Sequence, residues 1–371
     1  MPVRARGWPD AVTMRTSHRH PALLKSLFES NDMKALVVTR PGIDHLEVQE
    51  VPGPPDPRDH QILVNVKACG VNFADILMAN GQYAAGPKPP FIAGREYSGC
   101  ILSTGEDVMG YAQANGFAER VVTRREFTWP KPKPWSFEQA AAFPVNYFTA
   151  FFAYWWAGLW SPPGRQPDRI GETGSQGHDA LPGTPQHRPT VLIHAVAGGV
   201  GTAAVQIGKI LGVEMYGTSS ADEKLARAQK LGLDHPINYK RDDYEQFIQE
   251  ATKGRGVDAV LEMLGGEHTA KSTRCLAFRG RIIVYGSATG QQHQLDSRAL
   301  YAKNAAMHGL WLSPLSTHPE FMVPAWKQLS QWIDEGRLHP QIGHVYPLAQ
   351  ASDAFHLMLE RKNYGKIVLT I

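Results

Sequence analysis

The sequence predicts an α/β chain in two parts: a small β-rich part, followed by a doubly wound parallel sheet. Up to about residue 135, Pro, Gly and short strands dominate. From residue 190, buried strands alternate with helical segments, which is the pattern of βαβ units around a parallel sheet. The chain has 371 residues, 43% hydrophobic and 20% charged, which suits a sizeable core and two or three domains.

The β-rich part has three segments with strand character, because apolar residues alternate with polar ones or are β-branched. They are 34–39, 61–68 and 117–123, and the Pro-rich turn 51–60 precedes the second.

One helix is expected over 136–158, beginning with a capping box formed by Ser136 and Gln139. Within it, 143–160 carries no charge over 18 residues, which reaches the lower limit for a membrane span. Pro144 and Asn146, and the lack of a second such segment, favour a buried helix of a globular protein instead.

Two segments are expected to lie outside the packed core. Residues 161–189 are rich in Pro and Gly with no periodicity, which predicts a flexible insertion. Residues 1–32 are basic and are expected to form a disordered extension, with a mitochondrial transit peptide as the alternative.

From residue 190 on, the sequence predicts five strands with helices between them. Ser220 and Glu223 form a further capping box before the second of these helices. The expected strands are 190–195, 213–220, 235–239, 257–264 and 280–287, and the expected helices are 198–212, 221–232, 243–252 and 267–277.

The strongest functional motif is "HAVAGGVG", residues 194–201, which follows a strand and opens a helix. Glycines there permit a tight turn and let the backbone approach a pyrophosphate at the positive helix N-terminus. This context predicts dinucleotide binding, the alternative being a purely structural turn.

The end of the next strand selects the dinucleotide. NAD-binding chains usually place an acid there to hold the ribose 2′-hydroxyl, but this chain has Thr218, Ser219 and Ser220. Lys224 in the first turn of the following helix, and Tyr239 after the third strand, favour a 2′-phosphate and hence NADP(H). The alternative for Lys224 taken alone is a solvated helix residue.

Composition excludes several classes. A net charge of +3 gives no footprint for nucleic acid or an anionic membrane. Three dispersed cysteines make disulfides and a structural zinc site improbable, so a reducing, cytoplasmic location is expected. No motif supplies a protein nucleophile, so a bound nicotinamide would carry the chemistry.

Together, several stretches resemble the medium-chain dehydrogenases/reductases, and more closely the zinc-independent, zeta-crystallin-like quinone oxidoreductases. They occur in the family's order over most of residues 33–371. The stretches are "ACGVNFADILMANGQY" (68–83), "AGREYSG" (93–99), "NGFAERVV" (115–122), "EQAAAFPVNYFTAF" (138–151), "HAVAGGVGTAAVQIGKILG" (194–212) and "NYGKIVL" (363–369).

The resemblance implies a GroES-like substrate domain, 33–142 and 315–371, and a Rossmann cofactor domain, 143–314, with NADPH in the cleft between them. Relatives usually carry a longer loop within 99–110 than this chain does. A homodimer is also implied, with a small-molecule substrate and no nucleic-acid or membrane partner.

By position, the resemblance also assigns roles to individual residues. Asn72 would lie near the nicotinamide and the substrate carbonyl, and Tyr83 would be a substrate-side hydroxyl or, equally, an aromatic lid. The remaining cofactor contacts would be Thr149 and Gly286 at the nicotinamide, Gly198, Gly199, Val200 and Gly201 at the pyrophosphate, and Ser219, Lys224 and Tyr239 at the 2′-phosphate.

The same comparison bears on metal binding. Zinc-dependent relatives have a Cys and a His ligand where this chain has Asn72 and Arg95, and an Arg cannot ligate a cation. Cys69 matches a residue that is not a ligand. We therefore expect no zinc.

The expected function is hydride transfer from NADPH to a quinone or an α,β-unsaturated carbonyl, with groups such as Asn72 stabilising the oxyanion. Three alternatives stay open. They are an enoyl-thioester reductase, an alcohol dehydrogenase, which the missing ligands disfavour, and an NADPH-binding structural or regulatory protein with little turnover.

Overall fold

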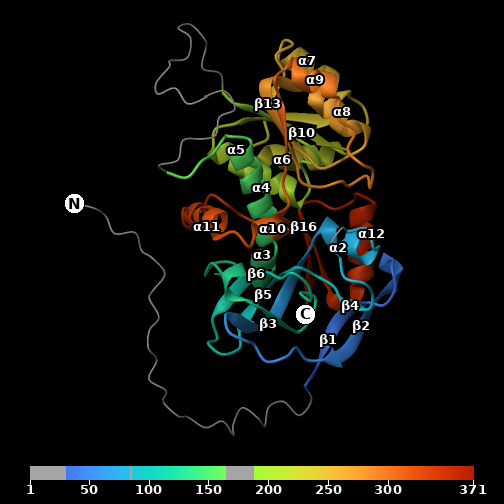
Figure 1. Cartoon of the computed structure of the whole chain (residues 1–371), viewed down its shortest axis with the longest axis vertical. Coiled ribbons are helices and arrows are strands. Elements are labelled where there is room, and N and C mark those ends of the chain that lie inside the picture. The colour runs from blue at the N-terminus through green and yellow to red at the C-terminus, as the bar shows by residue number, and fades with distance from the viewer. Residues whose placement is uncertain (1–30, 84–85, 164–187) are drawn as a thin grey trace, which may run out of the picture.

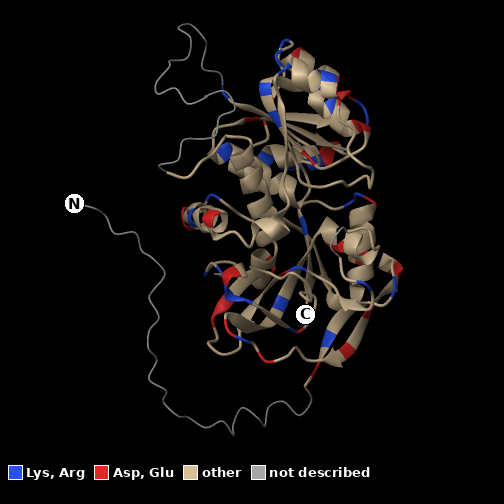
Figure 2. Ribbon diagram, in the orientation of Figure 1, with Lys and Arg blue, Asp and Glu red and all other residues tan. Residues whose placement is uncertain are grey.

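The computed structural model describes residues 31–83, 86–163 and 188–371, arranged as two lobes (Figure 1). Most of the extension 1–32 and of the insertion 161–189 lies outside the described residues. Asp32 already belongs to the first strand. Lys and Arg are interspersed with Asp and Glu over both lobes (Figure 2).

The lower lobe is built on two sheets. A seven-stranded sheet has the order β15-β16-β3-β5-β6-β8, with β7 also paired to β3, and a smaller sheet has the order β2-β1-β4. The strands are β1 Asp32–Val38, β2 Leu46–Pro52, β3 Gln61–Val71, β4 Phe91–Ile92, β5 Glu96–Ile101, β6 Asp107–Tyr111, β7 Arg120–Arg124, β8 Thr128–Pro130, β15 Ile342–Pro347 and β16 Lys366–Thr370. The helices are α2 Phe73–Ala79, α3 Phe137–Ala141 and α12 Ala351–Leu359, and 3₁₀ turns occupy Ile43–His45, Arg125–Phe127 and Leu348–Gln350.

The three strands predicted in this lobe are confirmed as β1, β3 and β7, with shifted ends. The short 99–110 segment forms a tight hairpin between β5 and β6. The Ile101 and Glu106 backbones are bonded at 2.9 Å, and Gly105 takes a φ of 71° at the turn. The shorter loop therefore still closes an antiparallel pair, Cys100 opposite Asp107.

The upper lobe is a six-stranded sheet of order β11-β10-β9-β12-β13-β14, with every neighbouring pair parallel. This order reverses direction beside β9, and ligands bind at the carboxyl ends of the strands at such a switch point. The strands are β9 Thr190–Ile193, β10 Glu214–Ser219, β11 His235–Asn238, β12 Val257–Glu262, β13 Leu276–Val284 and β14 Ala306–Gly309. The helices are α4 Pro144–Trp156, α5 Gly199–Ile210, α6 Asp222–Leu231, α7 Tyr244–Ala251, α8 Glu267–Arg274, α9 Ser297–Ala302, α10 Leu312–Leu315 and α11 Pro319–Asp334.

The prediction of one helix over 136–158 is wrong, because the segment forms α3 and α4. Pro144 has no N–H to donate and its ring clashes with the preceding turn, so it ends one helix and begins the next. The Ser136–Gln139 capping box is confirmed. Helix α4 is buried against the Rossmann-type sheet, and none of the described helices has the length and hydropathy to cross a membrane.

Two other local predictions are corrected. The N-cap of α6 is Ala221 and makes no side-chain hydrogen bond, so the expected capping box from Ser220 does not form. Instead, the carboxylate of Asp222 accepts a bond from Asn238 at 2.9 Å. The helix expected over 267–277 ends at Arg274, because Leu276 and Ala277 already belong to β13.

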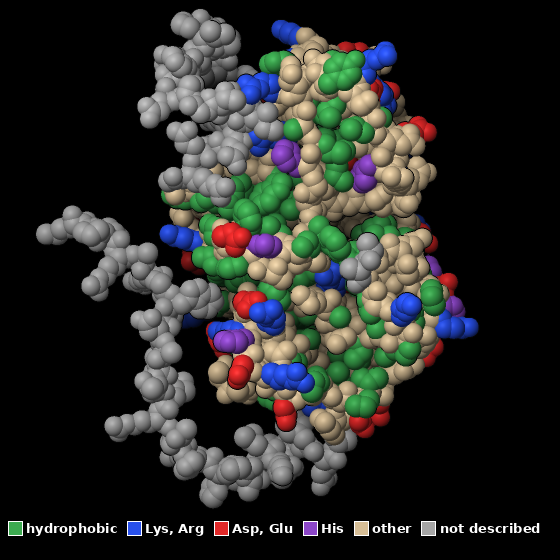
Figure 3. All heavy atoms as spheres, in the orientation of Figure 1, with side chains coloured by type: hydrophobic (Ala, Val, Ile, Leu, Met, Phe, Trp, Pro, Cys, Tyr) green, Lys and Arg blue, Asp and Glu red, His purple; other side chains and the backbone are tan. Residues whose placement is uncertain are grey.

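The last segment of the chain connects the two lobes. Helix α11 packs its buried face, which includes Leu329 and Trp332, into the same core as α4. The chain then returns to the lower sheet through β15 and β16, and on the way the Gly365 amide donates to the Ala197 carbonyl at 2.8 Å. Gly365 and Gly198 also form an isolated parallel bridge. The surface is hollowed between the lobes (Figure 3).

Candidate active site

The glycine turn after β9 leads directly into α5, with Gly198 as the N-cap and no side chain capping the helix. A Cβ on Gly199 would lie 2.5 Å from the Asn146 amide nitrogen, and one on Gly201 would lie 2.4 Å from the Ala195 carbonyl oxygen. At Gly201 the clash is with backbone, so only glycine fits there, while at Gly199 the Asn146 side chain would have to move. The turn therefore presents bare backbone at the positive end of a 12-residue helix, which suits an anion.

A cleft of about 260 Å³ opens at this turn, and we call it the glycine-turn cleft. It brings together eight of the ten residues predicted to hold the cofactor: Asn72, Gly198, Gly199, Val200, Gly201, Ser219, Lys224 and Tyr239. Thr149 and Gly286 line a different, neighbouring cavity.

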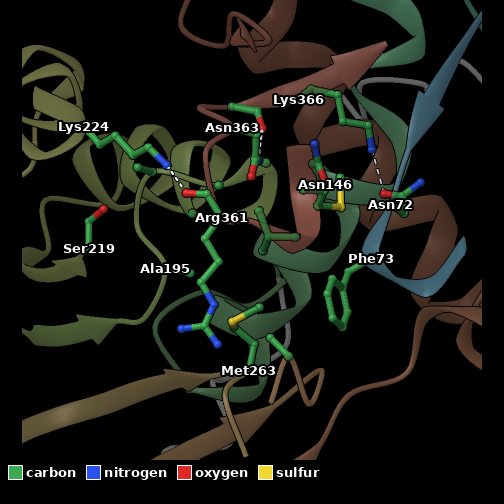
Figure 4. Close-up of a pocket in the computed structure, with 18 of the residues that line it drawn as sticks. Asn72, Phe73, Asn146, Ala195, Ser219, Lys224, Met263, Arg361, Asn363 and Lys366 are labelled. Atoms are coloured by element: carbon green, nitrogen blue, oxygen red, sulfur yellow. Dashed lines mark hydrogen bonds between the residues drawn. The ribbon is translucent and has the colours of Figure 1, made fainter. Parts of the chain in front are cut away.

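The end of the cleft predicted to hold a 2′-phosphate is partly filled by the returning chain. The Lys224 ammonium donates to the Arg361 carbonyl at 2.5 Å, and burial lowers the pKa of Lys224. The Arg361 side chain extends from there across the cleft toward Met263 (Figure 4). Arg361 was not among the predicted residues, although it lies just before the "NYGKIVL" stretch.

The opposite end of the cleft holds a buried network around Asn72. The Lys366 ammonium donates to the Asn72 side-chain oxygen at 2.6 Å (Figure 4). It also donates to Glu96 at 2.5 Å. The Asn72 amide in turn donates to Glu96 at 3.0 Å and to the Gly70 carbonyl at 3.2 Å. Both amide hydrogens of Asn72 are thus engaged within the protein.

Glu96 links this network to α4. Its other oxygen accepts from the backbone N–H of Val145 at 2.7 Å, at the first turn of that helix. Glu96 is fully buried and Lys366 nearly so, with side chains 0% and 3% exposed. Sequence reasoning missed both residues, because they are 270 positions apart and no local pattern joins them.

The second cavity measures about 1010 Å³ and is lined mainly by aromatic and apolar side chains, so we call it the aromatic cavity. It contains Tyr83, Thr149 and Gly286. It shares five lining residues with the glycine-turn cleft: Asn72, Phe73, Val200, Met263 and Tyr285. Its other ring-bearing residues are Phe73, Tyr111, Trp156, Tyr285, His293, Trp311, His318 and Phe321.

Arg95 is the charged residue of this cavity. Its guanidinium donates to the hydroxyls of Tyr83 at 2.8 Å and of Ser313 at 2.5 Å, and also to the hydroxyl of Tyr111. The Tyr83 oxygen accepts a further bond from the Trp311 indole at 2.6 Å. Burial raises the pKa of Tyr111 to about 12, so that hydroxyl stays protonated at neutral pH.

Two further ionisable groups lie close by. Asp75 in α2 accepts from the Asn72 backbone N–H at 2.8 Å, and burial, partly offset by that bond, raises its pKa to about 7. Cys69 is buried, its thiol donates to the Gly116 carbonyl, and desolvation raises its pKa well above the ordinary value. Cys69 is therefore part of the buried core.

Comparisons with known proteins agree on the family. Residues 58–133 match the alcohol dehydrogenase GroES-like domain, and 231–369 match the zinc-binding dehydrogenases. Quinone oxidoreductase-like protein 2 of Bos taurus is 33% identical over 339 residues, or 88% of this chain and 89% of that protein. This chain belongs to the quinone oxidoreductase branch of the medium-chain dehydrogenases/reductases.

Solved structures support the same placement. The quinone oxidoreductase of Thermus thermophilus, also solved in complex with NADPH, is 32% identical with a TM-score of 0.75, covering 91% of this chain and all of that one. The enoyl reductase CurK is 26% identical with a TM-score of 0.75, covering 92% and 99%. The predicted combination of a GroES-like and a Rossmann lobe is thereby confirmed.

At the two positions where zinc-dependent relatives have metal ligands, this chain has residues with other hydrogen-bond partners. Asn72 is bonded to Lys366 and Glu96, and Arg95 lies among hydroxyls. Over residues 31–83, 86–163 and 188–371, no three His, Cys, Asp or Glu side chains gather closely enough to hold a metal ion.

Proposed function

We propose that this protein is an NADPH-dependent, zinc-independent reductase that passes a hydride to a quinone or an α,β-unsaturated carbonyl compound. The observation that carries the proposal is the junction of the two cavities. The glycine-turn cleft and the aromatic cavity share Asn72 and Val200, so a cofactor in one reaches an acceptor in the other.

The residues of the glycine-turn cleft fit a dinucleotide phosphate. The backbone at Gly199 and Gly201 suits a pyrophosphate, and Ser219, Lys224 and Tyr239 offer two hydroxyls and an ammonium to a 2′-phosphate. No acid stands at the end of β10, where one would bind a ribose 2′-hydroxyl. The Thermus relative solved with NADPH supports the same assignment.

When bound, NADPH supplies the hydride, and this chain orients the reactants. Lys366 and Glu96 hold Asn72 rigidly at the junction, so a direct hydrogen bond from Asn72 to the substrate would replace one of the two it now donates. Thr149 and Gly286 also line the aromatic cavity. The aromatic walls give an acceptor bound there a less polar surrounding than water, which strengthens its polar interactions.

The proposed reaction adds one hydride and one proton to the acceptor. The acceptor gains the hydride at one carbon and its π electrons move to the carbonyl oxygen. Water then supplies a proton, because Asn72 and Thr149 are not acids.

A screen of NADPH oxidation tests the proposal. Purified protein is offered quinones, enals, enones and enoyl-thioesters, with and without a chelator, and absorbance at the NADPH band is followed. We expect turnover with quinones or enones that the chelator leaves unchanged. Activity that disappears with chelator and returns with zinc would contradict the metal-free mechanism. NADPH binding without oxidation of any acceptor would support the structural role instead.

Reduction of an enoyl-thioester is the second candidate, and Tyr83 favours it. The Tyr83 oxygen accepts from both Arg95 and Trp311, which leaves its own hydrogen free to donate to a substrate. The similarity to CurK supports this candidate too. A Tyr83→Phe variant with unchanged turnover of an enoyl-thioester would count against it.

Two further properties belong to the proposal. We propose a homodimer in the cytoplasm, since the family resemblance implies the dimer and the dispersed cysteines suit a reducing compartment. Light scattering of the purified protein would give twice the mass of one chain if the dimer forms.

A further inference from the structure

Arg95 has an unusual environment for a buried cation. The residue is 6% exposed, and its three hydrogen-bond partners are the neutral hydroxyls of Tyr83, Tyr111 and Ser313. Its Nε is buried and has no hydrogen-bond partner among the described residues. Within the described ranges, no carboxylate lies at ion-pair distance from this guanidinium.

Within the part of the chain that the structure describes, the nearby acidic groups form no ion pair with Arg95, although the guanidinium partly offsets the raised pKa of Asp75. Glu96 is paired with Lys366 at 2.5 Å. Asp75 directs one carboxylate oxygen to the Asn72 amide, and its pKa is raised to about 7. Tyr111 stays protonated. A desolvated cation without an ion-pair partner is unfavourable, so this site favours a ligand that brings a negative group.

We propose that Arg95 binds a carboxylate of the substrate, so that the preferred acceptor is an α,β-unsaturated carbonyl compound that also carries an acid group. The inference rests on the proposed function and names its substrate class. Arg presents a planar fork of N–H donors that matches a carboxylate, and the three neutral hydroxyls it now contacts leave its positive charge unneutralised.

The surrounding hydroxyls suit the same ligand. Tyr83 accepts two N–H bonds, so its own hydroxyl hydrogen is free to donate to an anion. The hydroxyls of Tyr111 and Ser313 are 2.7 Å apart, so one of their two hydrogens bonds the pair together and the other is free to donate. The cavity is large enough, at about 1010 Å³, to hold an acceptor between this corner and the junction at Asn72. The carboxylate does not react, and it fixes which end of the acceptor faces the cofactor.

A matched pair of acceptors tests the proposal. 4-Oxo-2-pentenoate and 3-penten-2-one differ by a carboxylate in place of a methyl group. We compare kcat/KM for both in the wild type, Arg95→Gln and Arg95→Lys, with NADPH affinity and thermal unfolding as measures of folding. The ratio of acid to neutral acceptor should fall by about tenfold or more in Arg95→Gln, mainly through KM, and by less in Arg95→Lys.

An equal loss of kcat for both acceptors in Arg95→Gln would overturn the carboxylate site and indicate stabilisation of the carbonyl oxygen instead.

Levulinate, the saturated acid, gives a readout without turnover. It should raise the melting temperature of the NADPH-loaded wild type more than 2-pentanone does, and Arg95→Gln should abolish that difference. If no acceptor is reduced, the proposed function fails, while the levulinate shift still decides the anion site. A levulinate shift equal to that of 2-pentanone in the wild type would overturn it.

Discussion

The glycine-turn cleft and the aromatic cavity adjoin, yet they are built differently. The pyrophosphate end of the cleft is made of backbone from one continuous stretch, 195–201, and its other walls come from side chains that follow the next two strands and from the returning segment 358–366. The aromatic cavity takes its polar corner from Tyr83, Arg95, Tyr111 and Ser313, which lie on separate elements of both lobes.

The difference indicates where each region is vulnerable. A site made of backbone at a helix N-terminus carries little buried charge, so changes in its side chains should affect binding more than folding. The junction and the polar corner hold Asp75, Arg95, Glu96 and Lys366 away from water. Changes there should affect folding as well, since a buried charge that loses its partner is costly.

The largest effect is expected for Glu96→Gln. It leaves the Lys366 ammonium buried without a counter-ion, so the free energy of unfolding should fall by about 3–5 kcal/mol in urea titrations. Glu106→Gln is the matched control, because its ion pair with Arg125 is exposed at 38% and 37% and should cost less than about 1 kcal/mol. Similar losses in both variants would show that the buried pair has no special weight.

Asp75 should make stability depend on pH. Its pKa is about 7 in the folded protein and near 3.8 when unfolded, so its favourable contribution is complete below about pH 4 and is lost as the pH rises through 7. The shift corresponds to about 4 kcal/mol. In Asp75→Asn, urea titrations from pH 4 to 8 should show a flatter profile than the wild type. Parallel profiles would mean that Asp75 does not titrate in this range.

Within the glycine turn, the same Gly→Ala substitution should have different effects on stability and NADPH binding at two positions. Gly201→Ala places a Cβ 2.4 Å from the Ala195 oxygen and should cost about 1–3 kcal/mol of stability and weaken NADPH binding. Gly198→Ala meets the same oxygen at 3.3 Å and should be tolerated better. NADPH fluorescence titration and thermal unfolding compare them, and a reversed order would contradict the geometry of the turn.

The smallest effect on folding is expected for Lys224→Ala. NADPH affinity should fall by about tenfold or more, as for a charge-assisted hydrogen bond, while NADH affinity and the melting temperature stay nearly constant. Lys230→Ala, an exposed lysine on the same helix, is the control. Equal losses for NADPH and NADH would refute the assignment of a 2′-phosphate to this end of the cleft.

The sequence predicted features built from neighbouring residues better than features that join distant parts of the chain. The parallel sheet, the glycine turn and the Ser136–Gln139 cap depend on residues close together in the chain, so local patterns revealed them. The break at Pro144 also had a local signal, which the unbroken apolar run 143–160 outweighed.

The polar corner and the buried ion pair had no such signal. Arg95 and Ser313 are 218 residues apart, and Glu96 and Lys366 are 270 apart, so only the folded chain brings them together. Arg95 was noticed as a residue that cannot ligate zinc, but its hydroxyl partners could not be inferred, because serine and tyrosine are common throughout the sequence.

The bridge between Gly198 and Gly365 also constrains the order in which the molecule can be assembled during synthesis. The six parallel strands are all translated by residue 309, so the upper lobe can begin to fold while the ribosome is still adding the rest. Arg361, Gly365 and Lys366 emerge later, and each lines the glycine-turn cleft. A nascent chain therefore completes its cleft only after β16 has been made, which keeps a half-finished protein from presenting the whole site.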